Sequence, residues 1–190
     1  MRYYRDNYNN TVKEVLVELD KALGAIDRES VEKFVAAVLE AEQVYFVGVG
    51  RVLLSLQSIC KRLAHLGIKT HYVGEITEPA ITDKDLLVVG SGSGGSLFPL
   101  GIAKKAHTIG AKIVHIGSNP NSEMKDICEF MVRIPVRTKN YLEDEIDSIQ
   151  PMTSLFEQSL LLFGDVAAKM IIDERQIDMK NLWMYHANLE

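Results

Sequence analysis

Short apolar runs alternate with helical segments through the middle of this chain, and this alternation constrains the fold more than any other feature. Five runs are expected to be strands: residues 44–47, 69–73, 86–89, 112–116 and 130–134. Continuously apolar runs that are separated by helices are typical of a parallel sheet with both faces covered. The sequence therefore predicts an α/β fold with a doubly wound, five-stranded parallel sheet, right-handed crossovers and flanking helices.

Helices are expected between these strands and at both ends of the chain. Apolar residues recur at three- and four-residue steps within residues 1–42, where Asp27-Arg28-Glu29-Ser30 has the composition of a helix start. A further helix is expected to follow Ser96 and to end at Gly110. The remaining expected helices cover residues 53–66, 122–128, 151–173 and 178–190, with Pro151 in the first turn of its helix. The polar stretch 136–150 is expected to be a loop, and loops of this length are often functional or mobile.

The length and composition are those of one globular domain. The chain has 190 residues, of which 47% are hydrophobic and 25% charged, enough to build a sizeable core. We expect a single domain over residues 1–190, with the helices of 1–42 and 151–190 packing on the sheet or on neighbouring subunits. These terminal helices offer more apolar surface than one small sheet needs, which predicts a homo-oligomer.

Several function classes are disfavoured by the sequence. No apolar run reaches the roughly 18 residues that a membrane span requires, and the first six residues lack the apolar core of a secretory signal. Cys60 and Cys128 lie far apart and form no C-x-x-C pair, which is typical of a reduced, cytoplasmic protein. A net charge of −5 disfavours nucleic acid as a partner. We therefore expect a cytoplasmic protein with neither a membrane nor a nucleic-acid partner.

A glycine- and serine-rich turn follows the third expected strand, and it is the strongest ligand signal in the sequence. Residues 90–96 read Gly-Ser-Gly-Ser-Gly-Gly-Ser and precede a helix. Ligands of open α/β sheets bind where strands end, and a helix start presents free backbone N–H groups to anions. The hydroxyls of Ser91, Ser93 and Ser96 can also donate to phosphate oxygens. The turn predicts a phosphate site, with a flexible connection as the alternative.

The turn after the first strand resembles half of a dinucleotide fingerprint. Residues 48–53 read Gly-Val-Gly-Arg-Val-Leu, so Leu53 stands where the fingerprint has its third glycine. Glu75 could imitate the ribose-binding acid, but the missing glycine makes a nicotinamide-dependent oxidoreductase a weak alternative. Arg51 either adds a cation to an anion site or is a solvated residue at a helix start.

One acidic residue and two histidines are candidates for proton transfer. Glu157 lies among apolar residues of its expected helix, so it occupies either the wet face of that helix or a dry pocket. A dry pocket would raise its pKa and suit general acid–base chemistry. His65 lies near a helix end, and the spacing of residues indicates no role for His186. The five histidines form no H-x-H or H-E-x-x-H motif, so we expect no metal site.

Taken together, these motifs resemble the sugar isomerase (SIS) fold, which is flavodoxin-like, and within it the 6-phospho-3-hexuloisomerase family. The resemblance covers nearly the whole chain. Its specific segments are residues 48–51, 62–67, 73–75, 90–94, 150–158 and 186–190. The segment that begins at Gln150-Pro151 and the terminal His-Ala-Asn-Leu-Glu are the parts that indicate this branch.

The resemblance implies an activity and a set of site residues. The family interconverts 3-hexulose 6-phosphate and fructose 6-phosphate through an enediol, uses no metal or redox cofactor, and typically forms tetramers. Glu157 would be the base, while His65 and His186 would polarise the carbonyl or handle hydroxyl protons, His186 in the site of a neighbouring subunit. The residues implied to bind substrate and its phosphate are Gly48, Gly50, Arg51, Ser91, Gly92, Ser93, Gly94 and Ser96.

Three residues depart from the family pattern, and all lie in the two ligand turns. Val52 and Leu53 replace the usual Ser-Gly pair, and Gly95 replaces a glutamate. These changes leave a second hypothesis open, in which the protein binds a phosphosugar of altered identity or binds one without turning it over.

Overall fold

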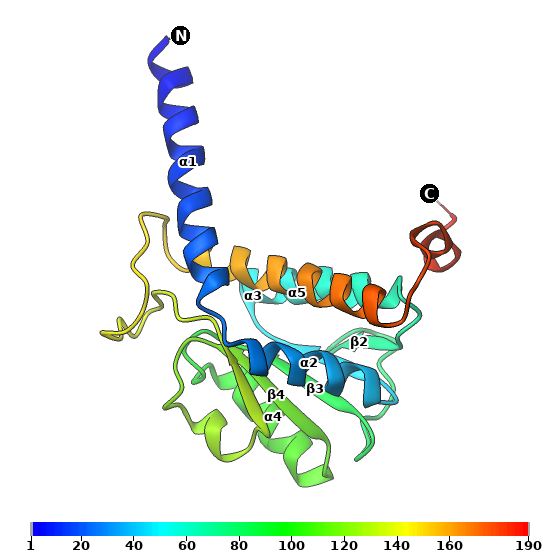
Figure 1. Cartoon of the computed structure of the whole chain (residues 1–190). Helices are drawn as coiled ribbons and strands as arrows, with labels where there is room; N and C mark the ends of the chain where they lie inside the picture. The colour runs from blue at the N-terminus through cyan, green and yellow to red at the C-terminus, as the bar shows by residue number, and fades with distance from the viewer. Residues whose placement is uncertain (1, 190) are drawn as a thin grey trace.

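The computed structural model describes residues 2–189, and their side chains from residue 7 onward. Its sheet has five parallel strands in the order β2-β1-β3-β4-β5, which confirms the predicted fold class. Figure 1 shows this sheet with its helices. The strands are β1 (Val44–Val47), β2 (Thr70–Tyr72), β3 (Leu86–Gly90), β4 (Lys112–Gly117) and β5 (Phe130–Arg133). The strand order reverses between β1 and β3, and this is the place where doubly wound sheets bind ligands.

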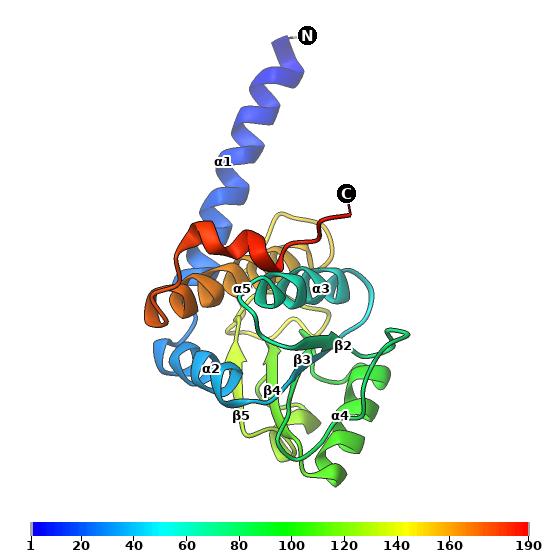
Figure 2. The same ribbon diagram turned by 90° about the vertical axis from the view of Figure 1, so that its right-hand side faces the viewer.

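Helices cover both faces of this sheet, as Figures 1 and 2 show. The α-helices are α1 (Arg2–Gly24), α2 (Arg28–Glu40), α3 (Gly50–Ala64), α4 (Leu97–Ile109) and α5 (Ser154–Glu174). Side chains of α2, α3 and α5 form one core with Val44 and Phe46 of β1. Side chains of α4 form a second core with Tyr45 and Val47 of the same strand. Alternate residues of a strand point to opposite faces, so both faces of the sheet are buried.

Two helix ends have the local chemistry that the sequence predicts. The Asp27 carboxylate accepts a hydrogen bond from the backbone N–H of Ser30 at 2.8 Å and caps the start of α2. Gly110 ends α4 with a φ of 93°, a left-handed conformation that glycine adopts without strain.

Four predicted helices differ from the structure. The helix expected at 53–66 is α3 (Gly50–Ala64), which begins three residues earlier. α5 begins at Ser154, because Met152 has a φ of 56° and the Ser154 N–H bonds to the Pro151 carbonyl in a separate turn. Pro151 therefore precedes the helix, and its placement in the first turn was wrong. The helix expected at 122–128 is only a 3₁₀ turn, η1 (Glu123–Asp126), and the C-terminal helix is the 3₁₀ segment η2 (Met179–Tyr185).

α1 extends well beyond the rest of the molecule and contacts α5 near its own C-terminal end (Figure 1). Among its side chains from residue 7 onward, the exposed apolar ones are Tyr8, Val12, Leu16 and Val17. Within residues 2–189, no helix has both the length and the apolar character to cross a membrane.

Candidate functional site

Both glycine-rich turns end neighbouring strands and open onto one cavity. The cavity has a volume of about 330 Å³ and lies at the carboxyl ends of β1 and β3, beside the N-terminal ends of α3 and α5. Its lining consists of residues 49–52, 90–93, 96, 138, 139, 152, 153, 156 and 157. Gly50, Arg51, Ser91, Gly92, Ser93, Ser96 and Glu157 are thereby brought together at one place, as the sequence analysis expected of them.

The carbonyl groups of the second turn point toward the end of β4. The Gly92 carbonyl accepts hydrogen bonds from the backbone N–H groups of Ser118 and Asn119 at 2.9 and 3.1 Å. The Ser93 carbonyl accepts from the Asn119 side chain at 3.2 Å. In a trans peptide the N–H of the next residue points opposite to the carbonyl, so the Ser93 N–H points away from β4. The turn therefore has backbone donors suited to an anion.

His115 of β4 contacts this turn through a hydrogen bond to its backbone. Its Nε2 lies 2.8 Å from the Ser91 carbonyl oxygen, and since that oxygen can only accept, Nε2 must donate. Burial lowers the pKa of the imidazole, although the bond to Ser91 works in the other direction. A neutral His115 therefore fixes the orientation of the peptide between Ser91 and Gly92. In this orientation the Gly92 N–H points away from His115.

Two glycines that were expected to bind substrate do not line the cavity. A Cβ at Gly48 would lie 2.8 Å from Leu56 Cδ1, so this glycine allows close packing of β1 against α3. Gly94 has a φ of 66°, and a Cβ there would lie 2.1 Å from the Ser122 Oγ. The structure thus places both glycines where they shape the turns.

Glu157 lies in the first turn of α5 with only 8% of its side chain exposed. Arg51 at the start of α3 donates to Glu157 Oε2 and forms an ion pair with it, while the Thr153 hydroxyl donates to Oε1 at 2.8 Å. The Arg51 side chain is 65% exposed, so its charge is also accessible from the cavity. Each carboxylate oxygen is held by one donor and has a further lone pair for a substrate proton.

His65 and His186 meet each other in a different cavity of the chain. Their rings stack with centroids 5.1 Å apart, and the lining there includes Arg62, Trp183 and both histidines. Arg51 and His65 are 14 residues apart on α3 and its C-cap, which corresponds to about 20 Å along a helix. One chain therefore does not bring the two histidines to Glu157.

The three departures in the ligand turns have different surroundings. Val52 lines the cavity, and a Cβ at Gly90 would lie 3.0 Å from its Cγ1. Leu53 and Gly95 do not line the cavity, and nothing lies within 4 Å of a Cβ built at Gly95. Of the three changes, the one at residue 52 alters the cavity wall directly.

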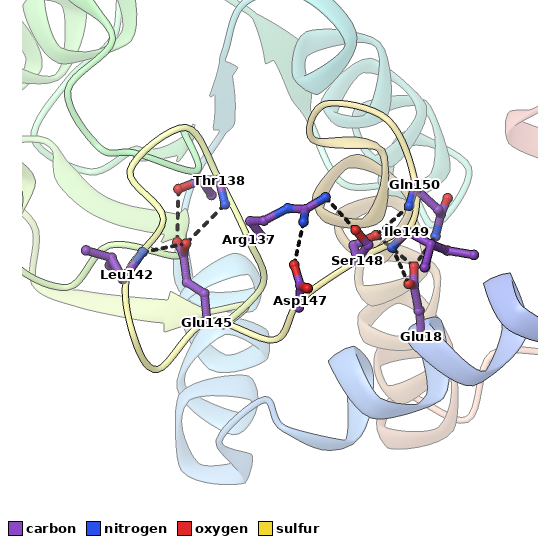
Figure 3. A network of polar contacts seen from close by, with 9 residues as sticks. All are labelled: Glu18, Arg137, Thr138, Leu142, Glu145, Asp147, Ser148, Ile149 and Gln150. Atoms are coloured by element: carbon purple, nitrogen blue, oxygen red, sulfur yellow. Dashed lines mark hydrogen bonds and ion pairs between the residues drawn. The ribbon is translucent and has the colours of Figure 1, made fainter.

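The cavity also contains residues that the sequence analysis did not single out, above all Thr138 and Lys139 from the segment 136–150. Arg137 contacts Asp147 and Ser148 in this segment, and Glu18 of α1 accepts hydrogen bonds from Ser148, Ile149 and Gln150 (Figure 3). Burial tends to raise the pKa of Glu18, but these hydrogen bonds outweigh it and lower the pKa. The length and polarity of the segment 136–150 indicated that it could be functional. They could not show that it reaches the cavity, because its path depends on contacts between residues far apart in the sequence.

The chemistry available in the cavity is acid–base and anion binding. A carboxylate, hydroxyls, backbone N–H groups and two cations line it. Within the described residues, no group of three or more His, Cys, Asp or Glu side chains is arranged to hold a metal ion.

Comparison with known proteins gives a consistent set of relatives, although no family model matches the chain. The chain is 34% identical over 179 residues to the 3-hexulose-6-phosphate isomerase of Bacillus subtilis, a match that covers 94% of this chain and 97% of that protein. It is 32% identical over 185 residues to the protein of the same name from Mycobacterium gastri, covering 97% and 92% of the two chains. A crystal structure of a protein from Methanococcus jannaschii, from which the same molecular function was inferred, has a TM-score of 0.80 at 27% identity. That match covers 97% of this chain and 99% of the other.

Proposed function

The chain belongs to the 3-hexulose-6-phosphate isomerase family, and from this premise we propose that it interconverts 3-hexulose 6-phosphate and fructose 6-phosphate. The observation that carries the proposal is the buried Glu157 carboxylate in the same cavity as the Ser91–Ser96 hydroxyls and amides. A base and an anion site in one cavity are what an isomerase of a phosphorylated sugar requires.

The reaction moves a carbonyl group by one carbon. In the forward direction the Glu157 carboxylate removes the proton from C2 of the open-chain 3-ketose, next to the C3 carbonyl. The electrons of the broken C–H bond form the C2=C3 bond of an enediolate, and the C3 oxygen takes the charge. The proton then returns to C3, the hydroxyl proton on O2 is transferred to O3, and the C2 carbonyl of fructose 6-phosphate forms. Arg51 and Thr153 hold the two carboxylate oxygens in place during this transfer.

In this proposal, the phosphate is bound by the second turn and the N-terminal end of α4. Ser91, Ser93 and Ser96 would donate through their hydroxyls, and Gly92 and Ser93 through their backbone N–H groups. Gly50 allows the first turn to pass close to the sugar, with a φ of 58° that glycine tolerates. The fold and its solved neighbours support assignment of a sugar isomerase (SIS) domain, and a phosphorylated metabolite as substrate supports a cytoplasmic location.

A coupled assay tests this function. The protein would receive 3-hexulose 6-phosphate, and fructose 6-phosphate would be followed through glucose-6-phosphate isomerase and dehydrogenase. We expect steady turnover that depends on protein concentration. Folded protein that is stabilised by phosphosugars but forms no product would contradict the proposal. That outcome would favour the alternative that Val52 suggests, a binding protein without turnover. For such a protein, ligand at a hundredfold excess over Kd should raise the free energy of unfolding by about 2.7 kcal/mol.

A homo-oligomer, specifically a tetramer, is part of the same proposal. The exposed apolar side chains of α1 support it, because this projecting helix could bury them against another subunit. Assembly would also give His65 and His186 a role at the cavity of a neighbouring subunit, since they lie away from Glu157 in their own chain.

Subunit complementation tests the shared site. We expect Glu157→Gln and His186→Gln chains to be separately inactive, and mixed oligomers to regain part of the activity. Recovery occurs because some sites then combine an intact Glu157 with an intact His186 from another chain. Sedimentation velocity would first establish the assembly. A monomer at micromolar concentration, or no recovery in confirmed mixed oligomers, would contradict the shared site.

A further inference from the structure

Lys139 belongs to the wall of the cavity that contains the phosphate turn. Its neighbour Thr138 is packed against that turn, since a Cβ at Gly92 would lie 2.9 Å from Thr138 Cγ2. Lys139 itself is exposed and lines the same cavity as Ser91, Ser93 and Ser96. The segment that follows β5 therefore brings a cation beside the phosphate turn.

The charges of the cavity leave this cation available. Arg51 is paired with the Glu157 carboxylate, which offsets its charge. In the described part of the chain, Lys139 has no carboxylate within ion-pair distance. A phosphate monoester carries close to two negative charges at neutral pH, which backbone donors and hydroxyls alone do not neutralise. Lys139 is thus the cation in this cavity whose charge no carboxylate of the described residues offsets.

Glu145 holds the segment in this place. Its carboxylate accepts four hydrogen bonds (Figure 3 draws three of them): from the Thr138 N–H at 3.1 Å, the Thr138 hydroxyl at 2.9 Å, the Leu142 N–H at 3.0 Å and the Ser118 hydroxyl at 2.8 Å. Ser118 in turn donates its backbone N–H to the Gly92 carbonyl. One carboxylate therefore connects the residue before Lys139 to the turn whose cavity Lys139 lines.

We infer that Lys139 is a phosphate-binding residue of this cavity and that Glu145 is the positioning residue that holds it against the Ser91–Ser96 turn. The inference rests on the proposed function, because it assigns the substrate phosphate to that turn. It adds a cation from the segment 136–150 to the phosphate site.

Direct binding of inorganic phosphate and of fructose 6-phosphate, measured by calorimetry, tests Lys139 without requiring turnover. Lys139→Met should raise both dissociation constants by about tenfold, because a charge-assisted hydrogen bond is lost. Lys139→Arg should restore most of the affinity. Lys125→Met, which removes an exposed lysine outside the cavity, should leave both constants unchanged. Where turnover is present, KM should rise in Lys139→Met with kcat changed by less than about threefold.

Unchanged binding of both ligands in Lys139→Met would overturn the inference. A fall in kcat with unchanged binding would also overturn it, because Lys139 would then act at the reacting carbons. Absence of turnover in the wild type, with tenfold weaker phosphate binding in Lys139→Met, would refute the isomerase proposal and leave the phosphate assignment intact.

The role of Glu145 is tested by a double-mutant cycle on the same binding constants. Glu145→Gln replaces an acceptor oxygen by an NH₂ group that faces donors, so the segment should lose its anchor. We expect weaker phosphate binding in this variant and little additional loss in the Glu145→Gln/Lys139→Met double variant. Fully additive losses would refute a positioning role. If the Glu145→Gln chain fails to fold, Thr138→Val replaces it in the cycle, because it removes one donor to the Glu145 carboxylate, and fully additive losses there would refute the role equally.

Discussion

Glutamine at position 157 should lower the rate of isomerisation by at least about a hundredfold while phosphosugar binding survives. Removal of a positioned general base typically lowers the rate by about 10²- to 10⁴-fold, and we expect kcat to fall within this range. Glutamine retains the size of the side chain and an oxygen that accepts from Thr153 or Arg51. The affinity for fructose 6-phosphate should therefore stay within about threefold of the wild-type value, because the lost interaction belongs to the transition state and not to the bound ground state.

The matched control is Glu174→Gln, which makes the same chemical change at an exposed site on the last turn of α5. It should leave kcat, KM and thermal stability unchanged. Glu157→Gln leaves Arg51 without its ion-pair partner, but this guanidinium is 65% exposed and its solvation limits the effect on folding. A Glu157→Gln protein with wild-type kcat would exclude Glu157 as the base.

Alanine at position 94 should disrupt the phosphate turn. The added Cβ would lie 2.1 Å from the Ser122 Oγ and 2.4 Å from the Ser122 Cβ, and the φ of 66° is unfavourable for alanine. Overpacking and the left-handed backbone together should cost about 2–4 kcal/mol of folding free energy. Any shift of the turn also moves the Ser93 N–H, so we expect at least about tenfold weaker binding of fructose 6-phosphate. Urea unfolding and calorimetry measure the two effects.

Gly95→Ala is the control, because it adds the same methyl group one residue later where no atom lies within 4 Å. Its folding free energy should stay within about 0.5 kcal/mol of the wild type. Combining Gly94→Ala with Ser122→Gly removes the two close contacts and should recover the steric part of the loss. Equal effects of Gly94→Ala and Gly95→Ala would contradict this account of the turn.

The sheet could be predicted from the sequence because its signals are local. β1 and β3 are apolar along their length, and such strands are buried on both faces whatever surrounds them. The ends of α2 and α4 were predictable for the same reason, since Asp27 and Gly110 act on their own helices. The start of α5 was not, because the positive φ of Met152 depends on how the preceding segment is anchored.

The candidate site was predictable only in part. The two glycine-rich turns have a backbone signature. Glu157 was a candidate because of its apolar neighbours in the sequence, and resemblance to a family gave it the role of base. Lys139 was missed because its position depends on Glu145 and Ser118, whose contacts no local pattern reveals. The stacking of His65 on His186 joins the end of α3 to the end of the chain, a contact that helical periodicity does not encode.

Proton transfer by Glu157 between C2 and C3 of a phosphorylated ketohexose can be followed by deuterium exchange. Fructose 6-phosphate would be incubated with the protein in D₂O, and the C1 and C3 protons would be followed by NMR. We expect loss of the C3 proton with the wild-type protein, retention of the C1 protons, and C3 exchange at least about a hundredfold slower with Glu157→Gln. Exchange at C1, exchange at C3 at the wild-type rate in the glutamine variant, or no exchange in wild-type protein that binds fructose 6-phosphate would exclude this role of Glu157.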